Sequence, residues 1–130
     1  MNYEALLDEA YENGLIVKEK PLKYKDGRIK GNKIAIRESI ETTKAKACIL
    51  AEELGHYYTT VGDILDQTVT ENRRQEHVAR KWAYEKILPI ENILFALQDG
   101  YTEIWDMAEY LEVDEEFLRD ALKYYGILDI

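Results

Sequence analysis

Three ionisable side chains near the middle of the chain could together carry out hydrolytic chemistry. Glu52, Glu53 and His56 lie in the run Leu-Ala-Glu-Glu-Leu-Gly-His, and Glu52 and His56 are one helical turn apart. On a helix these two side chains point the same way, and Glu53 borders their face. In the His-Glu-x-x-His pattern, two His four residues apart bind zinc and the Glu acts as general base. Here Glu52 stands in place of the first His, and Glu53 is the candidate base.

A third metal ligand is expected from the next long helix. The chain has only two His, so a catalytic metal site must use carboxylates beside His56. Glu76 precedes Ala79 by one turn and therefore lies at the edge of a buried face. Glu52, His56 and Glu76 could then hold one ion. His77 is an alternative ligand, but adjacent helical residues point about 100° apart, so one metal does not easily take both.

The ligand types bear on which metal would bind. One His with two carboxylates is a harder and more anionic set than two His with one Glu. Zinc is expected, and manganese or iron would be accepted more readily than at a two-His site. Tyr57 or Tyr58 could donate a hydrogen bond to a developing oxyanion. The alternative is that the paired acids are only a solvated helix face.

Composition predicts one domain spanning 1–130. The hydrophobic share of 46% in 130 residues is typical of a globular protein and argues against disorder. No apolar run is long enough to cross a membrane, and the N-terminus lacks the pattern of a signal peptide, so we expect a cytoplasmic protein. The lone Cys48 fits a reducing compartment. The sequence leaves the oligomeric state open.

Charge is unevenly distributed along the chain. The net charge of -9 disfavours direct nucleic-acid binding. Nevertheless, Lys18 to Lys46 carries ten Lys and Arg against four Asp and Glu, so the remainder is strongly acidic. The basic segment could dock an acidic protein partner. The alternative is a solvated hairpin with Lys along its edges.

The apolar spacing predicts a mainly helical α+β domain with a small antiparallel sheet near the N-terminus. The sheet is expected from Leu15 to Ile36, with a hairpin turn at Asp26-Gly27 and another turn at Gly31-Asn32. A loop is expected over 61–70. The expected helices cover 3–11, 43–58, 72–88, 90–97, 103–111 and 115–125.

The run that ends at His56 and the later segment that begins at Glu76 follow each other in the same order as two helices of a known family. The zinc helix of ImmA/IrrE-type metallopeptidases typically reads Leu-Ala-His-Glu-Leu-Gly-His, from which the run ending at His56 departs only at Glu52. The later segment resembles the helix that follows in that family. The residues in register there are Glu76, Ala79, Trp82, Ala83, Leu88 and Pro89. The resemblance extends from about Leu15 to Gly126.

The resemblance implies zincin-like helices, with Glu76 as the third zinc ligand. Family members are typically encoded by prophages and mobile elements and cleave a partner helix-turn-helix repressor. This implies a protein substrate and a hydrolase. One alternative is a catalytically inactive peptidase fold that regulates a repressor by binding, and another is a structural domain without metal. The C-terminal helix pair is similar to a helix-turn-helix, but eight acids against Arg119 and Lys123 argue against DNA contact.

Overall fold

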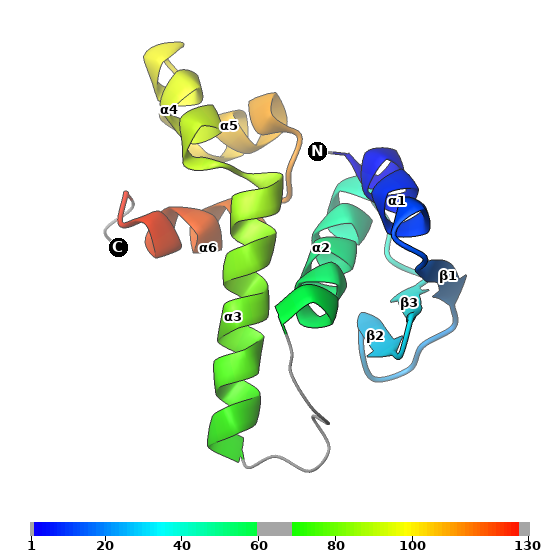
Figure 1. Ribbon diagram of the computed structural model, residues 1–130. Helices are drawn as coiled ribbons and strands as arrows, with labels where there is room; N and C mark the ends of the chain where they lie inside the picture. The colour runs from blue at the N-terminus through cyan, green and yellow to red at the C-terminus, as the bar shows by residue number, and fades with distance from the viewer. Residues whose placement is uncertain (1, 60–68, 128–130) are drawn as a thin grey trace.

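The computed structural model describes residues 2–59 and 69–127, which form six helices and three strands (Figure 1). The mainly helical α+β class is therefore confirmed, and most of the loop expected over 61–70 lies outside the described residues. None of the described helices is long and apolar enough to span a membrane. In chain order the elements are α1 (Tyr3–Glu12), β1 (Ile16–Lys20), β2 (Gly27–Lys30), β3 (Lys33–Arg37), α2 (Thr43–Thr59), α3 (Val69–Ile87), α4 (Ile90–Gln98), α5 (Ile104–Leu111) and α6 (Glu115–Tyr125).

The sheet is mixed, which corrects the expected antiparallel arrangement. Its order is β1-β3-β2, with β2 antiparallel and β1 parallel to the central β3. Gly31 has φ +61° and forms the β2–β3 hairpin turn with Asn32. The hairpin turn expected at Asp26-Gly27 is wrong, because Gly27 opens β2. The six-residue connection after β1 carries the chain far enough for β3 to pair between the other two strands.

Helix α2 separates the sheet from α3 (Figure 1). It begins where Thr42 Oγ1 accepts a hydrogen bond of 3.1 Å from the Ala45 N–H and so caps the helix. Ile34 and Ile36 of β3 are buried on the face of the sheet toward α2. Helix α1 packs beside α2 and β1 and covers the same face. The sheet, the pair of helices α1 and α2, and helix α3 therefore follow one another as layers.

Small residues bring α2 and α3 into backbone contact. A Cβ added at Gly55 would lie 2.4 Å from the carbonyl oxygen of Ala79, so the two helices meet where no side chain fits. Ala51 and Ala83, one turn away on either helix, are fully buried. We call this contact the α2–α3 seam. This contact fixes how far one helix is shifted along the other. It therefore sets the positions of the neighbouring residues, which include His56 on α2 and Glu76 on α3.

The other helices hold α3 in place from its C-terminal end. Tyr125 of α6 donates a 2.7 Å hydrogen bond to the carbonyl oxygen of Leu88. On the opposite side, Lys86 Nζ lies 2.6 Å from Glu9 Oε1 of α1. Helices α4, α5 and α6 gather around this end of α3 (Figure 1). The end of α3 that carries Glu76 therefore projects beyond this cluster.

Candidate metal and catalytic site

A histidine and a carboxylate meet across the α2–α3 seam. His56 Nε2 lies 3.1 Å from Glu76 Oε1, although the two residues are twenty positions apart. The His56 residue is 8% exposed, whereas the Glu76 side chain is 49% exposed and reaches in from the rim. The second ring nitrogen, Nδ1, is buried and has no hydrogen-bond partner within the described part of the chain. Glu76 is therefore the one described side chain that engages this ring.

Two further carboxylates lie one turn earlier on α2. Glu52 and Glu53 are both partly buried, and neither has a hydrogen-bond or ion-pair partner among residues 2–59 and 69–127. Burial, and after it the negative charges of Glu52 and Glu76, raise the pKa of Glu53 to about 7. Lys25 opposes this increase by lowering the Glu53 pKa. Glu53 thus retains a proton well above the pH at which an exposed Glu loses it.

Glu52 experiences a different balance of neighbouring charges. Burial raises its pKa, and the guanidinium of Arg80 on α3 is the largest opposing influence. Glu76 is among the acids that raise it again. Because Glu76 influences both Glu52 and Glu53, the three carboxylates form one electrostatic cluster around the His56 contact.

Strand β2 forms the wall of this cluster opposite to α3. A Cβ added at Gly27 would lie 2.7 Å from Cγ2 of Ile49 and 3.0 Å from both Cγ and Oε1 of Glu53. The glycine therefore lets the strand backbone lie directly against the Glu53 carboxylate. Glu53 therefore lies against the α2-facing side of β2, which is an edge strand of the sheet.

The structure brings His56 and Glu76 into contact, and the charge of Glu76 acts on both Glu52 and Glu53. His77 is exposed on α3 and has no hydrogen-bond or ion-pair partner among the described residues. Tyr57 and Tyr58 are 39% and 41% exposed, and the Tyr58 ring packs against Trp82 with centroids 5.3 Å apart. Among the described residues, no group of three or more His, Cys, Asp and Glu side chains is already arranged to hold a metal ion.

Sequence reasoning missed three residues that shape the cluster: Lys25, Gly27 and Arg80. Arg80 had a readable signal, because it lies one turn after Glu76 and so shares its helix face. Lys25 and Gly27 had none, since they reach Glu53 only through the placement of β2 against α2.

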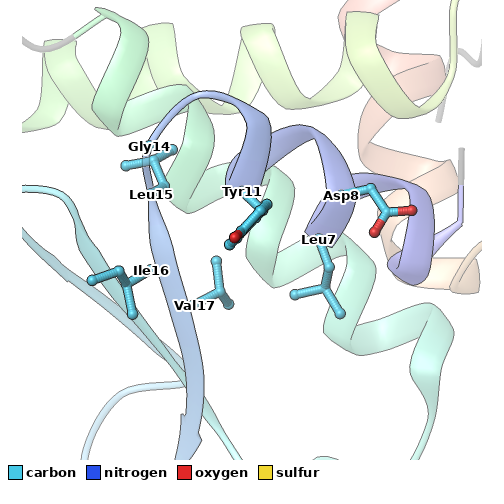
Figure 2. A pocket seen from close by; sticks show the side chains of 7 residues that line it. All are labelled: Leu7, Asp8, Tyr11, Gly14, Leu15, Ile16 and Val17. Carbon is cyan, nitrogen blue, oxygen red and sulfur yellow. The ribbon is translucent and has the colours of Figure 1, made fainter.

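A groove of about 700 Å³ lies elsewhere, between α1 and β1 (Figure 2). Leu7 and Tyr11 line it from the helix, and Leu15 and Val17 line it from the start of the strand. None of the four clustered ionisable residues lines this groove. The carboxylate cluster and this groove are therefore separate.

Comparison with known proteins places the chain in a family. A family model described as the IrrE N-terminal-like domain, peptidase M78, matches residues 14–123. The searches of curated proteins and of solved structures give no match. The matched range begins just before β1, ends within α6 and contains the whole carboxylate cluster. Because the match covers most of the chain, the protein belongs to the peptidase M78 family of IrrE N-terminal-like domains.

Proposed function

We propose that the protein is a metal-dependent endopeptidase of the ImmA/IrrE type. The observation that supports the proposal is the 3.1 Å contact between His56 and Glu76. The charge of Glu76 also acts on Glu53, which lies against Gly27 of the edge strand β2. A candidate general base, two candidate metal donors and a place for an extended peptide then lie together. The family membership supports the same reaction class.

The donor atoms suit a divalent cation. His56 Nε2 and Glu76 Oε1, 3.1 Å apart, are an imidazole nitrogen and a carboxylate oxygen, and both would serve as ligands to such an ion. Glu52 is the proposed third ligand, because it shares the helix face of His56 and its charge interacts with that of Glu76. Zinc is the proposed ion, with manganese or iron as alternatives for so anionic a set. When bound, the ion would supply Lewis-acid polarisation of the scissile carbonyl.

Glu53 is the proposed general base. Its carboxylate is partly buried and has no hydrogen-bond partner within the described residues, so it remains available to accept a proton from an attacking water. It would then pass that proton to the leaving amine. Because residue 27 has no Cβ, the Glu53 carboxylate can lie close to the backbone of β2.

An extended peptide is the substrate form that fits this wall. The outer edge of β2 offers backbone groups to which a further strand can hydrogen bond. A peptide added there would run past Gly27, against which Glu53 lies. We propose a helix-turn-helix repressor as the protein substrate, cleaved in a segment that can become extended.

The proposal is tested by incubating the purified, zinc-loaded protein with a helix-turn-helix repressor encoded beside it and following cleavage by gel and mass spectrometry. Glu53→Gln keeps the shape of the side chain, so it should abolish cleavage by a factor of at least about 10³ while repressor binding persists. His77→Ala is the matched control and should cleave normally. Cleavage undiminished in Glu53→Gln would refute the assignment of the base.

A second function is favoured by one specific feature, the Glu at the position of the first His ligand. A peptidase fold that has lost catalysis would regulate the repressor by contact alone. In that case Glu53→Gln and wild type would bind the repressor and inhibit its DNA binding equally, and neither would cleave it. A gel-shift measurement of repressor on its operator, run beside the cleavage assay, distinguishes the two functions.

A further inference from the structure

The sheet presents a second, chemically distinct surface on the side away from α2. Successive residues of a strand point to opposite faces, so the buried Ile34 and Ile36 fix which residues of β3 point outward. These are Lys33, Ala35 and Arg37. The strand register then assigns the outward residues of the two edge strands.

The outward set is almost entirely cationic. Lys33 lies opposite Ile16 on one side and Lys30 on the other, and Arg37 lies opposite Lys20. Ala35 lies between Lys18 of β1 and Arg28 of β2. We call this surface the basic face; its cations are Lys18, Lys20, Arg28, Lys30, Lys33 and Arg37, and its strand positions include no acid.

Most of these charges have no partner within the described parts of the chain. Arg37 Nε lies 3.5 Å from Asp26 Oδ1, and it also donates a 3.1 Å hydrogen bond to the carbonyl oxygen of Lys25. The other five cations make no ion pair with a described residue and are exposed. Helices α1 and α2 both pack on the opposite face of the sheet, so no described helix covers the basic face (Figure 1).

This arrangement costs folding stability, which calls for an explanation. Lys30 and Lys33 are directly opposite each other, as are Lys20 and Arg37, and like charges at paired positions are destabilising. Lysines on edge strands can protect a sheet from aggregation. That explanation does not extend to Lys33 and Arg37, because they lie on the central strand. Conflicts of this kind are expected where a surface serves binding.

We propose that the basic face docks an acidic segment of a partner protein. In an extended segment every second side chain points the same way, roughly 7 Å apart, which matches the spacing of Lys18 and Lys20 along β1. Because Ala35 has a small side chain, the middle of the basic face lies below the long cationic side chains around it. The backbone of a partner segment can therefore lie across it. This proposal does not depend on the peptidase activity.

The charge distribution favours a protein segment over nucleic acid. The chain as a whole carries -9 in spite of this face, so the surfaces formed by the rest of the chain are strongly acidic. A DNA duplex carries a charge roughly every 1.7 Å along its axis and would extend over those acidic surfaces. A short acidic segment remains on the face and avoids this repulsion.

The experiment uses a fluorescein-labelled peptide of about ten alternating Glu and Ser residues and measures its anisotropy in roughly 50 mM salt, where charge interactions reach farthest. The face variant carries Arg28→Glu, Lys30→Glu and Lys33→Glu. The matched control carries three reversals at exposed cations on α3 and α6 and therefore has the same net charge. Its substitutions are Lys81→Glu, Arg119→Glu and Lys123→Glu.

We expect the full-length wild-type protein to bind this peptide, the face variant to lose at least about tenfold in affinity, and the control to lose less than about threefold. Circular dichroism should show the same helix content in all three proteins. Equal losses in both variants, or no binding by the wild type, would overturn the proposal. Tighter binding of a DNA duplex than of the peptide, lost in the face variant, would also overturn it. So would salt-sensitive self-association that only the face variant abolishes.

Discussion

The two sides of α2 meet the rest of the molecule in opposite ways. Toward α3, Gly55 lets the helices touch at Ala79, and His56 has a partner in Glu76. Toward the sheet, the carboxylate of Glu53 lies against Gly27 and has no hydrogen-bond partner in the described regions. The α3 side is held by backbone contact, whereas the sheet side holds a partly buried carboxylate that no described hydrogen bond satisfies. One side of α2 therefore fixes the position of the helix, and the other side carries a carboxylate that is free to react.

The largest expected effect comes from breaking the seam with Gly55→Ala. The added Cβ would meet a backbone oxygen, which cannot rotate away, so the two helices must separate. We expect the free energy of unfolding to fall by about 3 kcal/mol, measured by urea denaturation. Alanine raises intrinsic helix stability by about 1 kcal/mol, so an unchanged or increased stability would mean that the seam is looser than described.

The next effect is the pH dependence of the free energy of unfolding that the partly buried carboxylate of Glu53 causes. The folded chain holds the Glu53 proton up to a pKa of about 7, whereas the unfolded chain releases it near 4.5. Between these values the folded state binds more protons, so the stability of the metal-free protein should fall as pH rises. We expect a loss of about 2 kcal/mol between pH 4.5 and 7.5, measured by urea denaturation across that range.

Glu53→Gln provides the control for this pH dependence. The variant should be more stable than wild type at pH 7.5, similar at pH 4.5, and shallower in its dependence, with Glu52 supplying the remainder. An identical pH dependence in the two proteins would remove Glu53 as its source.

A smaller effect is expected from Gly27→Ala on the sheet side. The new Cβ would meet the side chains of Ile49 and Glu53, which can move, and not a backbone atom. We expect a loss of about 1 kcal/mol in the free energy of unfolding, together with a larger proportional loss in cleavage rate because the Glu53 carboxylate is displaced. If Gly27→Ala destabilised the protein more than Gly55→Ala, the contrast between the two sides would be wrong.

The smallest effect is expected at the second histidine. His77 is exposed, so His77→Ala should change the free energy of unfolding by less than about 0.5 kcal/mol. His56→Ala removes a buried ring and the partner of Glu76, and should destabilise the metal-free protein measurably. Thermal unfolding of both variants checks the ranking. Equal effects at the two positions would contradict the placement of His56 in the seam.

Much of the helical framework was predictable because its signals are local. Apolar spacing, Thr42 before α2 and Pro89 after α3 located the long helices to within a few residues. The pairing of strands was not predictable in the same way, because the parallel pairing of β1 with β3 depends on where the chain goes after β1. The sequence contained the Gly31-Asn32 turn, but Asp26-Gly27 had the same local character.

For the candidate site too, the features that depend on local sequence were predictable, and those that depend on the packing of distant elements were not. Helical spacing was enough to put Glu52 and His56 on one face, whereas the close contact of Gly55 with Ala79 became visible only in the structure. The 3.1 Å approach of His56 to Glu76 depends on the relative heights of two helices, which no local pattern encodes. The contact between Gly27 and Glu53 depends in addition on β2 being an edge strand.

The central claim is that the cluster around His56 holds a metal ion, and metal content per chain tests it most directly. The protein would be loaded with zinc or manganese, dialysed exhaustively and measured by elemental mass spectrometry beside His56→Ala, Glu76→Ala and Glu52→Ala. We predict about one ion per wild-type chain, its loss in His56→Ala and Glu76→Ala, and weaker retention in Glu52→Ala. A wild-type protein that retains no ion, or variants that retain as much as wild type, would contradict the claim.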